Sequence, residues 1–278
     1  METGRCFATS PANVAAERDF NRVDVEGRAI DCIEQALAPL EQNAVQAIRT
    51  ASNSASFPNP EDHNLILNLI ALIAVRNPQR RRSFNQAREA TINMMGDLLV
   101  SDKRLFDRHV EKAKAAGENI ADSVSFEEMK RFVEERRYRI EFAPGDNLMT
   151  ELKTIDTVLP LLGQRTWSLF VAPPDGPEFI CCDHPLTLVW KSGRKAPVGF
   201  GCKQTEVFFP LGRGMGFYGT FEDVMPPVVK LNEYGVATMN ARTERHADRH
   251  IYSALPTFVM RRGDDIHECG PRDSSKSE

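Results

Sequence analysis

The segment EFICCDHPLTLVW, residues 178–190, joins two apolar runs through an Asp183-His184-Pro185 step. Both runs consist largely of the β-branched, aromatic and small apolar residues that strands favour, so each predicts one strand. Pro185 lacks a backbone N–H and interrupts strand pairing directly after two side chains that can carry chemistry. The segment therefore predicts a sheet in this part of the chain, with Asp183 and His184 where a strand ends.

The sheet pattern extends on both sides of this segment. It begins after Gly163 with TWSLFV at 166–171, and the turn PPDGP at 173–177 follows. Pro226-Pro227 is expected to lead into one late helix that runs to about Arg249. Strands are expected at 166–171, 179–182, 186–190, 206–209, 215–220 and 257–260.

Before Gly163 the apolar residues recur at steps of three and four, which is typical of helices. Pro39 should kink or split the first helix, Asn59 is placed to cap the second, and Asn77-Pro78 separates the second from the third. Ser125 to Glu128 form a capping box that starts a further helix. Helices are expected at 26–53, from 60, at 79–99, from 126 and at 147–162.

These patterns predict an α+β protein with an N-terminal helical half of about six helices. This half packs on a C-terminal, mostly antiparallel sheet that includes one late helix. The expected order is an irregular segment at 1–24, a helical region at 25–163, a sheet region at 164–262 and a disordered tail at 263–278. The helical and sheet regions are expected to form one integrated domain.

The composition is that of a globular protein: 278 residues, 41% hydrophobic and 27% charged. The formal charge of -4 excludes a general attraction to nucleic acid or to anionic membranes. The longest apolar run, Leu65–Val75, is too short to span a bilayer, so no membrane is expected. Six cysteines without a C-x-x-C pair, no N-x-S/T sequon and no signal peptide favour a cytoplasmic location.

Asp183 and His184 are the candidate catalytic residues. Neighbours on a strand point to opposite faces, so they can act together only if the chain turns at Pro185. Asp183 would then serve as a general base, a metal ligand or the partner of an arginine. The alternative is a structural carboxylate whose oxygens accept hydrogen bonds from nearby backbone N–H groups in a turn.

The run RNPQRRR at 76–82 is the only dense basic stretch. Its guanidinium groups suit phosphate or carboxylate ligands, so Arg76 and Arg81 are candidate ligand-binding residues. Because Arg76 ends an apolar helix, it is expected to be partly buried and paired with a carboxylate, for which Asp183 is a candidate. The alternative is an exposed helix start that pairs with acidic side chains elsewhere.

Three other patterns have plainer interpretations. His246 and His250 have the i, i+4 spacing of a metal site, but the arginines around them disfavour a cation, and no metal is expected. The glycines at 212–216 precede a strand rather than a helix, which predicts a hairpin turn and not a phosphate loop. Cys181 or Cys182 could be a nucleophile, although a free cysteine in a strand is usually a small buried apolar residue.

The order of several short motifs resembles a mostly bacterial family known only as domain of unknown function 4238. Arg76-Asn77-Pro78 with Arg81 resembles the family's Arg-Thr-Pro-x-x-Arg, and Phe179 to Pro185 is similar to its Phe-Ile-x-Ser-Asp-Asn-Pro. The other matching positions are the helix from Ile33-Glu34 through Leu40-Glu41, Trp167, Phe209-Pro210-Leu211, Asn240, Ala247 and Ile251-Tyr252-Ser253. The resemblance covers roughly residues 13 to 253.

The resemblance implies an α+β fold in which Asn240 joins the ligand-binding candidates. It assigns no reaction, substrate or cofactor. Members typically open with a His-Tyr-Val-Pro segment, whereas this chain starts METGRC, which leads us to expect a shortened, inactive or differently started version of the family. The family's motif has asparagine at the position of His184, which favours Asp183 as the more important residue of the two.

Two functional hypotheses follow. The leading one is a cytoplasmic protein of unassigned activity in which Arg76, Arg81, Asp183, His184 and Asn240 converge where the helical half meets the sheet. If it is an enzyme, we expect a hydrolase or phosphate-ester-acting enzyme, whose arginines bind an anionic small molecule or nucleic acid while Asp183 or His184 handles a proton or water. The alternative is a non-catalytic binding or scaffold protein, whose polar pairs only hold its two halves together. A reachable pocket containing both Arg76 and Asp183 would favour the enzyme.

Overall fold

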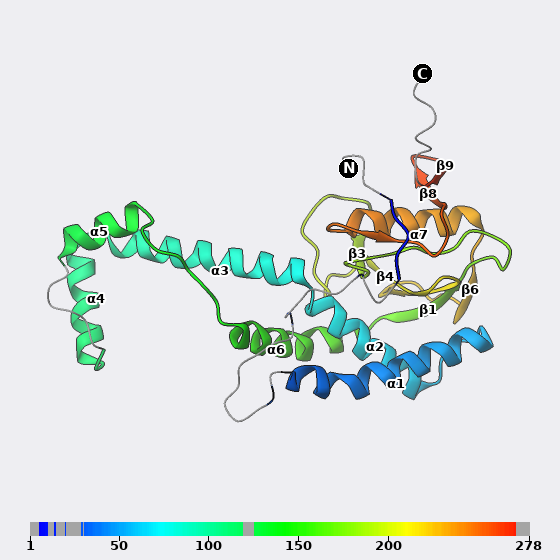
Figure 1. Cartoon of the computed structure of the whole chain (residues 1–278), viewed down its shortest axis with the longest axis horizontal. Helices are drawn as coiled ribbons and strands as arrows, with labels where there is room; N and C mark the ends of the chain where they lie inside the picture. Colours follow the sequence, from blue (N-terminus) through cyan, green and yellow to red (C-terminus); the bar gives the residue numbers. More distant parts are fainter. Residues whose placement is uncertain are drawn as a thin grey trace, which may run out of the picture. The chain divides into compact units, whose positions relative to one another are not determined.

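A computed structural model describes residues 31–118 and 125–270, with residues 6–10, 14, 20 and 29 nearer the start of the chain. The chain folds into two compact units (Figure 1). The first unit comprises Met1–Gln79 and Leu148–Glu278, and the second comprises Arg80–Asn147. The segment expected as one helical region at 25–163 is therefore shared between two units.

The described residues form helices before the sheet and one helix late in the chain, which confirms the α+β class. Local capping explains two of the helix starts. The Asn59 side chain accepts the Asp62 N–H at 2.8 Å, and Ser125 and Glu128 form the expected capping box. The helices are α1 (Cys32–Ser54), α2 (Pro60–Val75), α3 (Pro78–Leu99), α4 (Lys103–Ala115), α5 (Phe126–Glu134), α6 (Pro144–Gly163) and α7 (Glu233–His246).

Two helices differ from expectation. α1 continues unbroken through Pro39, because its later turns bury Ala44, Ala47 and Ala51 and packing offsets the lost backbone bond. α4 lacks a strong apolar pattern and was not expected. Its N-cap is Asp102, whose carboxylate accepts the Arg104 and Leu105 N–H groups.

The main sheet belongs to the first unit and has the order β3-β4-β5-β1-β6. Its pairs are antiparallel except β1 with β6, which are parallel. The hairpin turn between β4 and β5 includes Gly214, as the glycine pattern predicted. The strands are β1 (Thr166–Val171), β2 (Cys181–Cys182), β3 (Thr187–Trp190), β4 (Thr205–Gly212), β5 (Met215–Thr220), β6 (Val228–Lys230), β7 (Ile251–Tyr252), β8 (Phe258–Arg262) and β9 (Asp265–Cys269).

Helices cover both faces of this sheet (Figure 1). Alternate strand residues point to opposite faces, so Phe217 faces α1, α2 and the later turns of α6, while Phe208 faces α7. Both rings are 0% exposed, and burying such a side chain contributes roughly 2 kcal/mol. The first unit is thus a three-layer arrangement with the sheet in the middle.

The segment after Pro226-Pro227 begins as a strand instead of a helix. β6 adds to the sheet because Leu169 donates its N–H to the Pro227 carbonyl at 2.8 Å and Leu231 donates to the Val171 carbonyl at 2.8 Å. α7 starts only after Asn232, whose side chain accepts the Gly235 N–H at 2.9 Å. A short strand that needs a distant partner leaves little periodic signal in the sequence.

The segment expected as a tail from residue 263 is partly a strand. Gly263 adopts a left-handed φ of 63° that suits a tight turn, and it lets β9 pair back onto β8. Residues 271–278 of the expected tail lie outside the described residues.

The second unit is held by side chains between α3 and the segment that follows α5. Tyr138 donates its hydroxyl to Asn93 Oδ1 at 2.7 Å, and Arg136 forms an ion pair with Asp97 at 2.7 Å. Phe106 of α4 packs against Phe126 of α5, with ring centroids 5.5 Å apart. These contacts define a small unit in which the described residues form helices and no strand.

His63 of α2 is expected to make the protein less stable in acid. Its ring packs against Phe57, Trp167 and Phe217 at centroid distances of 5.2, 6.5 and 5.7 Å, and burial lowers its pKa below 6.5. The unfolded state therefore binds the proton at higher pH than the folded state does. The free energy of unfolding should fall as the pH drops below 6.5 and level off below the lowered pKa. Urea titrations at several pH values should show a weaker pH dependence in His63→Phe, and an unchanged dependence would contradict this.

Candidate functional site

Asp183 lies in the bend between β2 and β3, and its carboxylate binds the chain that follows α7. Oδ1 accepts the Asp248 N–H at 2.8 Å, and Oδ2 accepts the N–H groups of Arg249 at 2.7 Å and His250 at 3.0 Å. The Asp183 N–H in turn donates to the His250 carbonyl at 3.2 Å. This carboxylate satisfies three backbone donors beyond the end of α7, so the helix stops at His246 and not near Arg249 as expected.

Asn77 connects the corner between α2 and α3 to the same bend. It is 4% exposed, and its side-chain nitrogen donates to the Asp183 carbonyl at 2.9 Å. Its Oδ1 accepts the Gln79 N–H at 2.9 Å. Asn77 is not among the site residues predicted from the sequence, although its position before Pro78 in the Arg-Asn-Pro motif is a signal for it.

Arg76 is buried and paired, as its place at the end of an apolar helix suggested. The carboxylate that the structure places beside it is Glu151 of α6, with Nε and Oε2 3.4 Å apart. Their side chains are 5% and 8% exposed, so neither can reach a ligand in bulk solvent without movement. Asp183, the partner proposed from sequence, instead binds the backbone at 248–250.

Asn240 is completely buried on α7 and binds three backbone groups. Its Oδ1 accepts the Ile180 N–H at 3.0 Å, and its nitrogen donates to the carbonyls of Glu178 at 2.9 Å and Val259 at 3.0 Å. It therefore joins α7 to the segment before β2 and to β8.

His184 is 9% exposed, and its ring lies 6.3 Å from that of His246. His246 Nε2 accepts the Leu188 N–H at 3.3 Å, and Nδ1 lies 2.9 Å from the Arg242 carbonyl, which requires a neutral ring protonated on Nδ1. Leu188 belongs to β3, an edge strand, so His246 covers part of that edge. His250 lies beyond the end of α7, so the helical histidine pair does not form.

Four of the five candidate residues belong to the first unit: Arg76, Asp183, His184 and Asn240. Arg81 belongs to the second unit. Asp183 is linked by hydrogen bonds to the α2–α3 corner and to the end of α7, and Asn240 holds the strand that leads into Asp183. Three of the candidates thus make contacts between distant segments of the fold.

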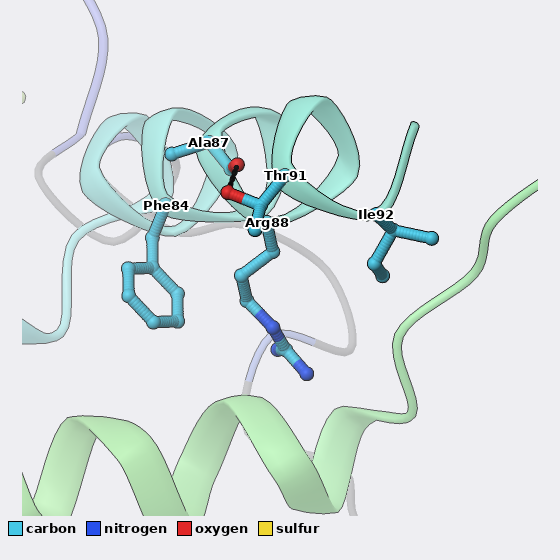
Figure 2. Close-up of a pocket in the computed structure, with 5 residues that line it drawn as sticks. All are labelled: Phe84, Ala87, Arg88, Thr91 and Ile92. Atoms are coloured by element: carbon cyan, nitrogen blue, oxygen red, sulfur yellow. Dashed lines mark hydrogen bonds between the residues drawn. The ribbon is translucent and has the colours of Figure 1, made fainter. Parts of the chain in front are cut away.

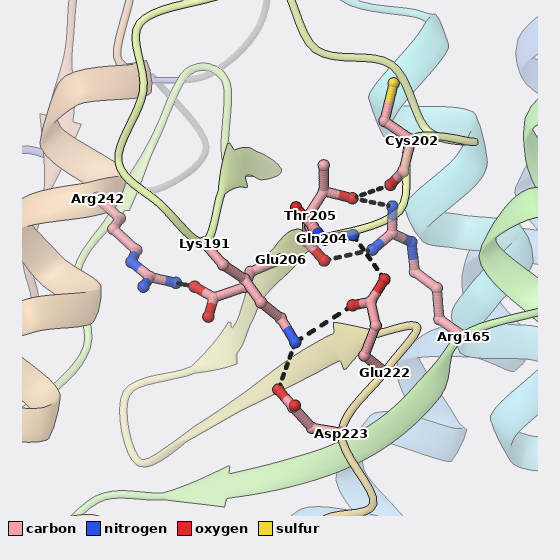
Figure 3. A network of polar contacts seen from close by, with 9 residues as sticks. All are labelled: Arg165, Lys191, Cys202, Gln204, Thr205, Glu206, Glu222, Asp223 and Arg242. Atoms are coloured by element: carbon pink, nitrogen blue, oxygen red, sulfur yellow. Dashed lines mark hydrogen bonds and ion pairs between the residues drawn. The ribbon is translucent and has the colours of Figure 1, made fainter.

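A second polar cluster, missed from the sequence, lies at one end of the main sheet (Figure 3). Arg165 is 5% exposed and donates to the carbonyls of Phe200 at 2.8 Å and Thr205 at 3.1 Å. Burial lowers its pKa to about 10, so it remains charged at neutral pH. Lys191 pairs with Glu222 at 3.2 Å and with Asp223 at 2.6 Å. This cluster ties the loop between β3 and β4 to Arg165 before β1 and to the segment that follows β5.

Neither adjacent thiol is activated. Burial raises the pKa of Cys182 to about 12 and also raises that of Cys181, so both remain protonated at neutral pH. A nucleophilic cysteine needs the opposite shift. The two residues act here as small apolar side chains of β2.

A cavity of about 390 Å³ lies in the first unit between the 175–178 loop, the start of α7 and the β8–β9 hairpin. Its lining includes the carboxylates of Asp175, Glu178, Glu233 and Glu268 and no lysine, arginine or histidine. An acidic lining suits a cationic group better than an anion. Arg76, Asp183 and His184 do not line it.

Within the described residues, no three His, Cys, Asp or Glu side chains gather as a metal site would require. No helix in this part of the chain is both long and apolar enough to cross a membrane.

Comparison with known proteins gives one match. The family model described as "Protein of unknown function (DUF4238)" matches residues 1–255. No curated protein and no solved structure matches the chain. The match covers both units of the fold, all five candidate residues and the Asp183 bend, and it confirms the resemblance seen in the motifs. The chain therefore belongs to the DUF4238 family of proteins of unknown function.

Proposed function

We propose that this protein is a non-catalytic binding or scaffold protein, in which the family's motif residues stabilise the fold. The observation that carries the proposal is the Asp183 carboxylate, both of whose oxygens accept backbone N–H groups at 248–250. A general base needs a lone pair directed at the substrate, whereas these lone pairs are directed at the protein's own backbone.

Two further residues support this function. Asn240 makes three side-chain hydrogen bonds to backbone groups of other segments, and it is completely buried. Arg76 is buried beside Glu151, which neutralises its charge within the fold. Both side chains are thus held by partners within the fold and are buried from solvent.

Asp183→Asn tests the proposal. The amide would turn an NH₂ group towards backbone donors, so we expect a loss of roughly 3 kcal/mol in the free energy of unfolding. Urea denaturation of the free protein measures this loss. A change within about 0.5 kcal/mol would show that Asp183 is not structural and would contradict the proposal.

The second candidate is the hydrolase or phosphate-ester-acting enzyme, favoured by one observation. His250 Nδ1 lies 3.8 Å from Asp183 Oδ2, and the His250 side chain is 57% exposed while that of Asp183 is 19% exposed, so a solvent-exposed histidine lies beside a partly exposed carboxylate. In this candidate Arg76 and Asn240 bind an anionic group while Asp183 or His184 handles a proton. A rise in melting temperature with phosphate esters that Asp183→Asn abolishes, without destabilising the free protein, would support the enzyme.

A further inference from the structure

Helix α3 carries an apolar stripe that its own unit leaves exposed. The helix has no fully buried side chain along its 22 residues, whereas the 16-residue α2 buries seven. Met94, Met95 and Leu98 are 65%, 62% and 62% exposed. Helices in water owe most of their stability to packing of an apolar face, so this stripe indicates a partner.

The stripe has the spacing of a coiled-coil seam. Phe84, Ala87, Thr91, Met94 and Leu98 follow one another at alternating steps of three and four, which are a and d positions of a heptad. All five are exposed. A seam of this spacing matches a second helix that lies nearly along the first.

The first half of the stripe forms a hole. A cavity of about 330 Å³ is lined by Phe84, Ala87, Arg88, Thr91 and Ile92 (Figure 2). The first four occupy positions i, i+3, i+4 and i+7, the set that receives one knob from a facing helix. The Arg88 guanidinium carbon lies 3.9 Å from the Phe142 ring centroid, which fixes one wall of the hole.

The second half of the stripe supplies the knobs. We propose that α3 pairs antiparallel with α3 of a second copy of this chain, each inserting Leu98 into the other's hole while Met94 packs beside it. In that register Leu98 faces Ala87 and Met94 faces Thr91, so a large residue meets a small one in both layers. A two-fold axis fills both holes and covers both sets of knobs, whereas an unrelated helix would have to match hole and knobs separately. The second copy is therefore the occupant, and this inference is independent of the proposed function.

Sedimentation equilibrium of the full chain tests the pairing. We expect a species of twice the chain mass of 31.2 kDa at micromolar concentration, and a monomer for Met94→Glu/Leu98→Glu with an unchanged circular dichroism spectrum. Val224→Glu is the control, because Val224 is 95% exposed in the first unit and should leave the dimer intact. A monomeric unsubstituted chain, or a dimer that survives the double substitution, would overturn the inference.

Cysteine cross-linking tests the orientation, since residues 80–147 contain no cysteine. A mixture of Ala87→Cys and Leu98→Cys chains should form a disulfide-linked dimer above the background of the unsubstituted chain, and neither variant alone should. Cross-linking of Ala87→Cys with itself, and none in the mixture, would show a parallel pair and overturn the proposed register.

Discussion

Asn240→Ala is expected to lower the free energy of unfolding by about 4 kcal/mol, because three buried backbone groups lose their partner together. The Ile180 N–H and the carbonyls of Glu178 and Val259 all bind this one side chain, which is 0% exposed. These groups come from segments on either side of α7, so the loss should also weaken the attachment of β8. Equilibrium urea denaturation measures the effect.

Asn64→Ala is the matched control. Asn64 is an exposed helical asparagine on α2, and its removal should change the free energy of unfolding by less than about 0.5 kcal/mol. Asn240→Asp keeps an acceptor for Ile180 but presents a carboxylate to two carbonyls, so it should also destabilise strongly. A loss below about 1 kcal/mol for Asn240→Ala would mean that water replaces the amide and that the residue does not hold the fold.

Arg165→Met should lower the free energy of unfolding by roughly 4 kcal/mol, about as much as Asn240→Ala, because it leaves buried acceptors without a donor. The guanidinium binds the Phe200 carbonyl, the Thr205 carbonyl and the Thr205 hydroxyl at 2.8, 3.1 and 2.9 Å. It also stacks on Phe221, with its central carbon 4.2 Å from the ring centroid. Methionine matches the aliphatic part and supplies none of these bonds.

Arg194→Met is the control for Arg165. Arg194 is exposed and its guanidinium carbon lies 3.5 Å from the Trp190 ring centroid, so its loss should cost no more than about 1 kcal/mol. Arg165→Lys should lower the free energy of unfolding by an amount between those of Arg165→Met and Arg194→Met, because an ammonium cannot span the same three acceptors. Thermal and urea unfolding of the three variants would rank their losses in the free energy of unfolding. Equal losses for Arg165→Met and Arg194→Met would contradict the prediction.

Features that depend on neighbouring residues could be predicted from the sequence. The caps at Asn59 and Ser125 involve residues at most three positions away, and β1 and β5 have the bounds that alternation predicted. β6 could not be predicted, because three residues become a strand only beside β1. The sequence predicts a tail from residue 263, because the strand that pairs across the Gly263 turn is polar and largely exposed.

Short motifs in the sequence identify the candidate residues, but they do not predict which groups these residues contact. Arg76 finds Glu151 and Asp183 finds the backbone at 248–250, each more than sixty positions away along the chain. Both partners satisfy the physical expectation that a buried charge is paired and a turn carboxylate binds N–H groups. The sequence predicted the kind of interaction without its partner.

The sequence by itself determined the α+β class, most helix and strand positions and the family, because periodicity, caps and short motifs are local. Only the tertiary structure decided that Arg80–Asn147 forms its own unit, that the Asp183 carboxylate holds the chain after α7, and that the α3 stripe is left exposed. The reason is physical: burial and long-range hydrogen bonds depend on which distant segments the folded chain brings together, and no local pattern records that choice.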